Sequence, residues 1–467
     1  MKKQCIMNSL IQRKSDENIA LQDETISISY SKMLTLLEIN SRRIVDNDEQ
    51  NIGVFAENSI EFVIAFLSII YAGKTAVIIT DSSKGKKLIQ DCEIKTIFVG
   101  NTNIFHFEEK LTVLCTITES SVQISNYKQV YHCNDNYIAV MMTTSGTTGE
   151  GGVVPILYKN LNKRIVYTNR YYSRNNGRKE LIIVPIHLTL GNQQQLLTAL
   201  YVGMHIYIYD SVFLPRKIVN LINREAINYV SLVPTMLRAF VNYLEKEKKL
   251  LDLNGIYIAG DTLQPELISK AKSVLSKTLI YSAYGMTEIA PICIKKYNNK
   301  DKDEELRGVG KPIKGMQVKI FQGEENQETG DGIGEICVKH SMIEVERYSD
   351  DGWFHTGDMG YLARDGEVIL CGRLKNMLIR NGYNIFPEMI ERKILNSEMV
   401  KEAMVYMDNS KLIANIVVKQ EEFNIQELIK FCKINLEQVE MPSDFRIVTS
   451  IEKNEGMKIL RRKDASI

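Results

Sequence analysis

The segment Thr143-Thr144-Ser145-Gly146-Thr147-Thr148-Gly149 contains only threonine, serine and glycine, and it comes directly after the apolar run Tyr137 to Met142. Glycines let a backbone approach a ligand closely, and hydroxyl and amide donors can then converge on phosphate oxygens. A flexible surface linker is the competing interpretation of such a composition. Because the segment follows an expected strand, we favour a phosphate-binding loop.

Other well-known motifs do not match this segment. A Walker loop requires Lys and Ser or Thr after its second glycine, but Gly151 is followed by Gly152-Val153. An esterase GxSxG elbow is absent, because Thr143 stands where glycine is needed before Ser145. The six histidines contain no HExxH pattern, which leaves zinc catalysis without support.

The composition indicates an ordinary globular chain. Its 467 residues are 44% hydrophobic, and 58 basic against 57 acidic side chains leave a net charge of +1. A nucleic-acid binder is usually strongly basic, and the uncharged run Phe62 to Gly73 is too short to span a bilayer. These two features predict no nucleic-acid partner and no membrane span. The eight cysteines are scattered without a CxxC pair, and the N-terminus is unlike a signal peptide. Both observations predict a cytoplasmic protein with reduced thiols.

Apolar strand-like runs alternate with helical patterns over the first 300 or so residues. The expected strands are 51–55, 75–80, 95–100, 181–185, 205–209 and 229–233, with helices at 59–72 and around 193–199. Such alternation predicts parallel sheets that are covered on both faces. Short strands with Gly-rich turns follow and predict antiparallel structure, and the last part of the chain returns to mixed α and β.

Further motifs carry residue types suited to a nucleotide. In Tyr284-Gly285-Met286-Thr287-Glu288, the ring can stack on a purine, the Thr hydroxyl can reach a phosphate and the carboxylate is a natural magnesium ligand. In Trp353-Phe354-His355-Thr356-Gly357-Asp358, the aspartate can accept both ribose hydroxyls, although aspartate after glycine is also a common turn residue. Gly372-Arg373-Leu374-Lys375-Asn376 and Asn454-Glu455-Gly456-Met457-Lys458 follow. Taken alone, a solvated glutamate and a surface lysine are the simpler interpretations.

In this order, the segments resemble the motifs of the adenylate-forming superfamily, which includes acyl- and aryl-CoA synthetases, luciferase-like enzymes and peptide-synthetase adenylation domains. The resemblance runs from about residue 25 to 462, and Gly308-Val309-Gly310-Lys311-Pro312 and Gly334-Glu335-Ile336 match two further family segments. It implies an α/β fold: a large N-terminal adenylation domain over 1–374, with parallel α/β sheet subdomains and a small β subdomain, and a small mobile α+β lid domain over 375–467. Lys375 would be the hinge.

The resemblance also implies roles for single residues. The β- and γ-phosphates of ATP would be held by Thr144, Ser145, Gly146, Thr147, Thr148 and Gly149. The adenine would be contacted by Gly260, Asp261 and Tyr284. The ribose would be held by Asp358 and Arg373, and the acid would be contacted by His187 and Gly285. Thr287 would contact the α-phosphate, and Glu288 would bind Mg²⁺. Lys458 would bridge the acid carboxylate and the α-phosphate.

Two departures from the family pattern stand out. The phosphate loop usually continues with Pro-Lys-Gly, but Gly151-Gly152-Val153 stand here, so the loop lysine is missing. We expect weaker ATP affinity rather than loss of the chemistry, because other donors and Mg²⁺ also neutralise the phosphates. The catalytic lysine usually follows glycine, whereas Met457 precedes Lys458.

The implied activity is that of an AMP-forming ligase, which activates a carboxylic acid as acyl-adenylate and transfers the acyl group to a thiol. Amino-acid-activating relatives place an aspartate near Pro185 to Gly191, where this chain has His187-Leu188. A fatty, aromatic or other acid without an α-amino group is therefore favoured, since an unpaired buried ammonium is costly. His187 gates the pocket, contacts the acid or packs in the core. Coenzyme A is the favoured thiol, and the phosphopantetheine of a separate carrier protein is the alternative acceptor. The alternative to a ligase is a catalytically impaired nucleotide-binding protein.

Overall fold

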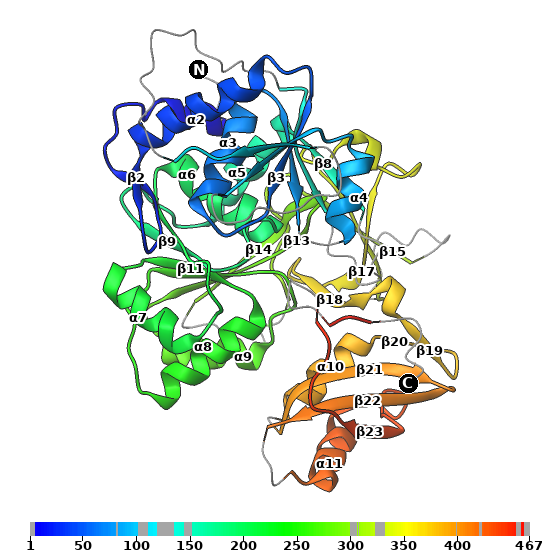
Figure 1. Cartoon of the computed structure of the whole chain (residues 1–467). Coiled ribbons are helices and arrows are strands. Elements are labelled where there is room, and N and C mark those ends of the chain that lie inside the picture. Colours follow the sequence, from blue (N-terminus) through cyan, green and yellow to red (C-terminus); the bar gives the residue numbers. More distant parts are fainter. Residues whose placement is uncertain are drawn as a thin grey trace.

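The computed structural model describes residues 5–80, 83–100, 111–118, 135–143, 152–298, 306, 308–322, 332–397, 399–419, 423–453 and 459–461. Figure 1 shows two sheet-and-helix layers at the N-terminal end, a smaller sheet beside them, and a C-terminal part that lies below the smaller sheet. The phosphate loop predicted at Thr144 to Gly149 and the predicted catalytic Lys458 lie outside the described residues.

The first sheet has six strands in the order β6-β5-β3-β4-β7-β8, all parallel except the β7–β8 pair. Its strands are β3 (Asn51–Phe55), β4 (Thr75–Ile79), β5 (Thr96–Val99), β6 (Thr112–Cys115), β7 (Ile138–Thr143) and β8 (Val153–Leu157). Its neighbouring helices are α2 (Tyr30–Val45), α3 (Ile60–Tyr71), α4 (Ser83–Asp91) and α5 (Tyr158–Tyr171). The hydroxyl of Ser59 caps α3, whose apolar residues are almost all buried, as expected of a helix inside the core.

The second sheet has eight strands in the order β14-β13-β12-β11-β9-β10-β1-β2. They are β1 (Ile19–Gln22), β2 (Ser27–Ser29), β9 (Lys179–Ile182), β10 (His205–Ile208), β11 (Tyr229–Leu232), β12 (Gly255–Ile258), β13 (Leu279–Met286) and β14 (Ile289–Tyr297). The associated helices are α1 (Ile6–Ile11), the π-helix η1 (Leu190–Leu197), α6 (Thr198–Val202), α7 (Pro215–Glu225), α8 (Pro234–Lys246) and α9 (Pro265–Val274). Proline at the first turn of α7, α8 and α9 suits a helix start, where no amide bond is lost.

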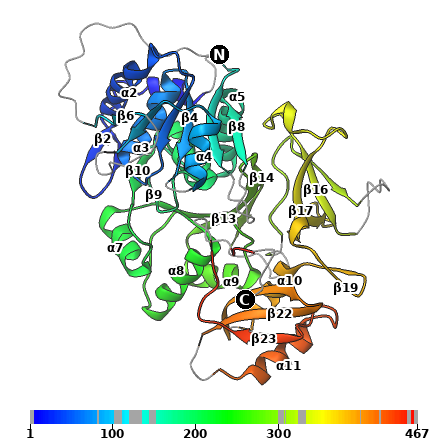
Figure 2. The same ribbon diagram turned by 45° about the vertical axis from the view of Figure 1, so that its right-hand side comes forward.

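A four-stranded antiparallel sheet follows, in the order β15-β16-β17-β18. Its elements are β15 (Gln317–Phe321), β16 (Gly334–Lys339), the 3₁₀ turn η3 (Val345–Arg347), β17 (Phe354–Leu362) and β18 (Val368–Arg373). Figure 2 shows this sheet beside the N-terminal layers and above the C-terminal part.

The C-terminal part has its own apolar core around Ile390, Val405 and Leu428. It contains η4 (Leu374–Asn376), the hairpin β19 (Leu378–Arg380) and β20 (Tyr383–Ile385), α10 (Pro387–Leu395), β21 (Val400–Asp408), β22 (Lys411–Val418), α11 (Ile425–Asn435) and β23 (Asp444–Ile447). The side chain of Asn396 donates a hydrogen bond to Glu266 on α9 at 2.9 Å, which links this part to the second sheet.

The expected α/β fold, with parallel sheets followed by antiparallel and then mixed structure, is confirmed. Five strands of the second sheet run parallel from β9 to β13, and their carboxyl ends therefore meet at one edge. In such sheets ligands bind outside this edge. Among the helices of the described segments, none combines the length and apolarity needed to cross a bilayer.

Candidate active site

A cavity of about 590 Å³ lies at this edge of the second sheet. Residues that follow strand ends line it, including Val184 after β9, Val233 after β11 and Gly260 after β12. Tyr284 and Asp358 line it from β13 and β17. Further lining residues come from the C-terminal part, namely Lys375, Asn376, Glu388, Glu391, Arg392, Leu395, Ala403, Ile459 and Arg461. The cavity is thus shared between the large N-terminal part and the C-terminal part.

The cavity lining includes a group of apolar and neutral polar side chains, which we call the apolar end. It consists of Val184, Leu188, Leu190, Val233 and Met236, together with Thr189 and Gln194. An uncharged organic tail can be buried there without leaving a charge unpaired.

The loop after β9 shapes this apolar end, and Asn58 fixes its course. The Asn58 amide donates to the carbonyl of Val184 at 3.2 Å and accepts the amide N–H of Ile186 at 2.7 Å. Gly191, the second residue of the π-helix η1, packs against the same loop, since a Cβ there would stand 2.4 Å from the carbonyl oxygen of Pro185. Sequence reasoning missed Asn58, because its partners lie more than a hundred positions away.

Asp358 also lines the cavity and is buried between two donors. The Tyr284 hydroxyl donates to Oδ2 of Asp358 at 2.8 Å, and Arg373 Nε lies 2.8 Å from Oδ1. Burial, together with the nearby Asp358 carboxylate, raises the pKa of Tyr284 well above its usual value, so Tyr284 remains a donor. A carboxylate has about four acceptor sites, which leaves Asp358 capacity for further hydroxyls.

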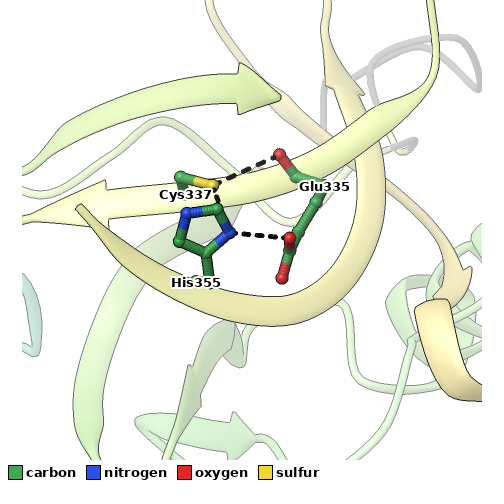
Figure 3. A group of neighbouring side chains, drawn as sticks. All are labelled: Glu335, Cys337 and His355. Carbon is green, nitrogen blue, oxygen red and sulfur yellow. Dashed lines mark hydrogen bonds and ion pairs between the residues drawn. The ribbon is translucent and has the colours of Figure 1, made fainter. Parts of the chain in front are cut away.

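A cluster beside Asp358 fixes the preceding turn (Figure 3). Cys337 on β16 lies opposite His355 on β17, and Glu335 lies two residues earlier on the same strand. Glu335 accepts from the Gly357 amide at 2.9 Å with one oxygen and contacts His355 Nδ1 at 2.8 Å with the other. The cluster therefore holds the backbone of Gly357, next to Asp358.

These three side chains are of types that bind metals, and their ligand atoms lie within 4.8 Å of one another. Each is already engaged, however, since Cys337 Sγ also lies 3.4 Å from His355 Nδ1. Burial, with Glu335 nearby, raises the pKa of Cys337 to about 12, so the sulfur stays a protonated thiol. We interpret the cluster as structural.

Thr287 and Glu288 form the turn between β13 and β14, at the rim of the cavity. Thr189 donates a hydrogen bond to the Thr287 hydroxyl at 3.2 Å. Among the residues that the structure describes, none donates a hydrogen bond to the Glu288 carboxylate. Mg²⁺ is bound through carboxylate and phosphate oxygens, and it commonly takes only one or two protein carboxylates. Glu288 therefore fits the ion predicted for this position.

Most of the site residues predicted from sequence meet in this one cavity. They are Gly260, Asp261, Tyr284, Gly285, Thr287, Glu288, Asp358, Arg373 and Lys375. Gly285 cannot be enlarged freely, because a Cβ would stand 2.9 Å from the Ile289 carbonyl oxygen. His187 is half-buried and is not among the residues that line the cavity.

Sequence reasoning missed two arginines near the site, of which Arg164 is buried and Arg461 is half-buried. Arg164 lies under the Thr287–Glu288 turn, and Arg461 pairs with Glu391 at 2.6 Å. Arg461 follows Ile459, which lines the cavity. A single arginine on a helix or in a terminal segment carries no sequence signal of its own, so only the fold identifies these two.

The AMP-binding enzyme family model matches residues 10–344 of the chain. A 2-succinylbenzoate–CoA ligase of Lactococcus lactis is 26% identical over 431 residues, which cover 90% of this chain and 91% of the relative. A 2-succinylbenzoate–CoA ligase of Oceanobacillus iheyensis is 25% identical, with 88% of each chain covered.

Solved structures agree with the fold. The O-succinylbenzoate coenzyme A synthetase MenE of Bacillus subtilis, in complex with ATP and magnesium ion, superposes with a TM-score of 0.84. Its identity is 22%, and the match covers 97% of this chain and 98% of that one. The anthranilate–CoA ligase AuaEII, in complex with anthranoyl-AMP, gives 0.85 at 18% identity, with coverages of 98% and 95%.

These matches confirm the superfamily predicted from the motifs, and with it the class of ATP-dependent, AMP-forming ligases that activate carboxylic acids. The relatives reported above are named as CoA ligases, so the carrier-protein alternative is not favoured. The roles predicted for single residues, and the domain boundary at residue 374, stay predictions. Since its family match spans well over half of the sequence, the chain belongs to the AMP-binding enzyme family.

Proposed function

We propose that this protein joins a carboxylic acid with an uncharged tail to coenzyme A, through an acyl-adenylate. The observation that carries the proposal is the cavity itself, whose lining combines apolar and neutral side chains with Asp358, Thr287 and Glu288. The apolar end suits the tail of the acid. Asp358, Thr287 and Glu288 suit a nucleotide and its metal ion.

In the first half-reaction, a carboxylate oxygen attacks the α-phosphorus of ATP, and pyrophosphate leaves. Thr287 would donate its hydroxyl hydrogen to the α-phosphate, and Asp358 would hold the ribose hydroxyls. Mg²⁺, when bound at Glu288, would neutralise charge on the phosphates. Electrostatic stabilisation of this kind supplies most of the catalysis in phosphate chemistry.

In the second half-reaction, the thiol sulfur attacks the acyl carbonyl carbon, and AMP leaves. Neither step needs a nucleophile from the protein. This agrees with the high pKa of the buried Cys337 and Cys293, which burial raises, since a catalytic cysteine needs a lowered pKa. We assign no covalent role to either.

A specific second candidate for the acid is 2-succinylbenzoate, which the names of the relatives from Lactococcus lactis and Oceanobacillus iheyensis support. This acid carries a second carboxylate, which would need donors such as the amide of Gln194 or the hydroxyl of Thr189 at the apolar end. A benzoate-like or aliphatic acid makes no such demand.

ATP–pyrophosphate exchange tests the proposal. We expect exchange with a substituted benzoate or a medium-chain fatty acid, and none with an α-amino acid. Exchange with 2-succinylbenzoate but with neither of these acids would favour the second candidate instead. Coenzyme A and a pantetheinylated carrier protein are then compared as acceptors, and we expect thioester only with the former. Exchange driven only by an α-amino acid, or ATP binding without exchange for any acid, would contradict the proposal.

A variant at the apolar end sharpens the test. Met236 lines this end from the first turn of α8, so Met236→Trp should fill the space intended for the acid tail. We expect ATP binding to persist and exchange to fail for the bulkier acids first. Exchange unchanged in Met236→Trp would place the acid elsewhere.

A further inference from the structure

Arg164 is completely buried beneath the turn that carries Thr287 and Glu288. It lies on α5 with about 1% of its surface exposed. Its Nη1 donates to the carbonyl oxygen of Thr287 at 3.0 Å, and its Nη2 donates to that of Glu288 at 2.6 Å. One planar guanidinium therefore binds two successive carbonyls of the turn.

Glu344 supports this arginine from the other side. Its Oε2 lies 3.6 Å from Nη2 of Arg164, and the Glu344 side chain is almost wholly buried. Its Oε1 accepts from the backbone N–H of Leu157 at 3.3 Å and from the side chain of Asn160 at 3.2 Å. The carboxylate is thereby fixed to the junction of β8 and α5, and it compensates a charge that would be costly to bury alone.

Gln193 completes the surroundings of the guanidinium. Its Oε1 accepts a second hydrogen bond from Nη1 of Arg164 at 3.2 Å, and its Nε2 lies 3.1 Å from the sulfur of Met142 on β7. Arg164 is thus held by side chains from η1 and the segment around η3, while its donors point at the turn. Burial lowers the pKa of Arg164 to about 10, partly offset by Glu344, so the side chain stays protonated at neutral pH.

We infer that Arg164, held by Glu344, is the positioning residue that fixes the Thr287–Glu288 turn, so that the Thr287 hydroxyl and the Glu288 carboxylate meet the nucleotide and its metal ion. This inference rests on the proposed function. Arg164 touches neither substrate nor metal and acts through the backbone of the turn.

Only arginine suits this arrangement. Its planar fork presents several N–H donors in fixed directions, whereas a lysine ammonium is a single point charge on a flexible stem. A lysine in place of Arg164 would keep the charge that compensates Glu344, but it would not bind both carbonyls in the same geometry. A misplacement of about 1 Å at a reacting group costs about 10²-fold in rate.

The test compares Arg164→Lys with a matched control. Arg174 pairs with Glu180 at 2.6 Å, and both are wholly buried, but Arg174 binds no part of the Thr287–Glu288 turn. ATP binding is measured by equilibrium dialysis over a series of Mg²⁺ concentrations, so that the readout does not depend on turnover. Exchange rates and backbone hydrogen exchange of the β13–β14 segment are measured on the same preparations.

We expect Arg164→Lys to raise the Mg²⁺ concentration needed for half-maximal ATP binding by about tenfold, and to lower the exchange rate by about 10- to 100-fold. Hydrogen exchange at the β13–β14 turn should become faster. Arg174→Lys should lower the melting temperature at least as much as Arg164→Lys does, but it should leave the Mg²⁺ concentration for half-maximal ATP binding unchanged. A merely structural role of Arg164 predicts equal Mg²⁺ midpoints in both variants.

A second variant keeps the test decisive if Arg164→Lys does not fold. Arg164→Met combined with Glu344→Leu removes both buried charges, a change that proteins often tolerate. It also removes the donors to both carbonyls, so the Mg²⁺ midpoint should again rise. An unchanged midpoint in the folded variants overturns the inference. ATP binding in the wild type without exchange for any acid instead overturns the proposed function and leaves the comparison of midpoints valid.

Discussion

The Tyr284 hydroxyl donates to one oxygen of Asp358 at 2.8 Å, while Arg373 holds the other oxygen at the same distance. The two contacts come from β13 of the second sheet and from the end of β18 in the third. Asp358 is therefore held by two sheets at once, in the orientation from which it can accept further hydroxyls into the cavity. A preorganised acceptor of this kind loses little entropy when its ligand binds.

Replacing Asp358 by Asn should weaken nucleotide binding strongly. The change turns half of an acceptor pair into a donor and removes the partner of Arg373. Hydrogen bonds to charged groups contribute about 1.5–3 kcal/mol, which corresponds to a loss of about 10- to 100-fold in affinity for AMP and ATP. Calorimetric titration with AMP measures the effect directly.

Tyr284→Phe is the matched control for Asp358→Asn. It keeps the aromatic ring and removes only the neutral donor to Asp358, and the freed acceptor site becomes available to a ribose hydroxyl. We expect AMP affinity to change much less than in Asp358→Asn. Equal losses in the two variants would show that the hydroxyl of Tyr284, rather than the carboxylate, governs ribose binding.

His355 predicts a pH dependence of stability. Burial lowers the pKa of His355, but the carboxylates of Glu335 and Asp351 outweigh burial and raise it above its usual value of about 6.5. The folded state therefore binds the proton more tightly than the unfolded state. The stabilisation is fully present below the unfolded pKa and is lost as the pH rises through the folded pKa.

Melting temperatures measured from about pH 5.5 to 8.5 test this expectation. The wild type should exceed His355→Gln by the largest margin at the acidic end, and the margin should shrink as the pH rises. Because Glu335 also binds the Gly357 amide, AMP affinity should fall along with the margin. A margin that is constant across this range would mean that His355 stabilises the protein only as a neutral side chain.

The ion pair between Arg461 and Glu391 predicts that removing the arginine alone destabilises the protein. Arg461 donates to both oxygens of Glu391, at 2.8 and 2.6 Å, and to the Val405 carbonyl at 3.0 Å, which ties the terminal segment to α10 and β21. Burial raises the pKa of Glu391, against the effect of Arg461. Arg461→Met leaves a buried carboxylate uncompensated, a loss of about 3–5 kcal/mol.

A double variant distinguishes the contribution of the ion pair from that of packing. Arg461→Met combined with Glu391→Leu should melt at a higher temperature than Arg461→Met alone, because no unpaired charge remains. The single variant should also regain stability at acidic pH, where Glu391 takes up a proton. If the double variant is less stable than the single one, the pair contributes through packing rather than charge.

Some of the predicted site residues stand directly after strand ends: Gly260 follows β12, and Thr287 and Glu288 follow β13. Because parallel strands of one sheet end at the same edge, local patterns were enough to bring these positions together. Asp358 lies within β17 of another sheet, so its place at the cavity depends on how the two sheets pack. The roles given to Thr144 to Gly149 and to Lys458 stay predictions, as they lie outside the described residues.

The supporting residues could not be predicted in the same way. Arg164 and the carbonyls it binds are 123 and 124 positions apart, and Glu391 and Arg461 are 70 apart. No helical or strand period connects such partners, and a charged residue within a helix is usually solvated. Their burial follows from how the layers pack, which one sequence alone does not reveal. His187 differs from these residues, because the sequence predicted it as a site residue but it is not among the residues that line the cavity.

Lys458→Ala should separate the two half-reactions. Lys458 lies outside the described residues, and the resemblance to the family predicts that it bridges the acid carboxylate and the α-phosphate. Its charge would screen the repulsion between the acid carboxylate and the α-phosphate, a repulsion that exists only before the acyl-adenylate forms. Loss of one such preorganised group costs about 10²–10³ in rate. Exchange should therefore fall by that factor, while thioester formation from supplied acyl-adenylate and coenzyme A should stay near the wild-type rate.

Lys453→Ala is the control, because Lys453 pairs with Glu402 at 2.8 Å and is not among the residues that line the cavity. Equal loss of both half-reactions in Lys458→Ala would refute a role confined to adenylation.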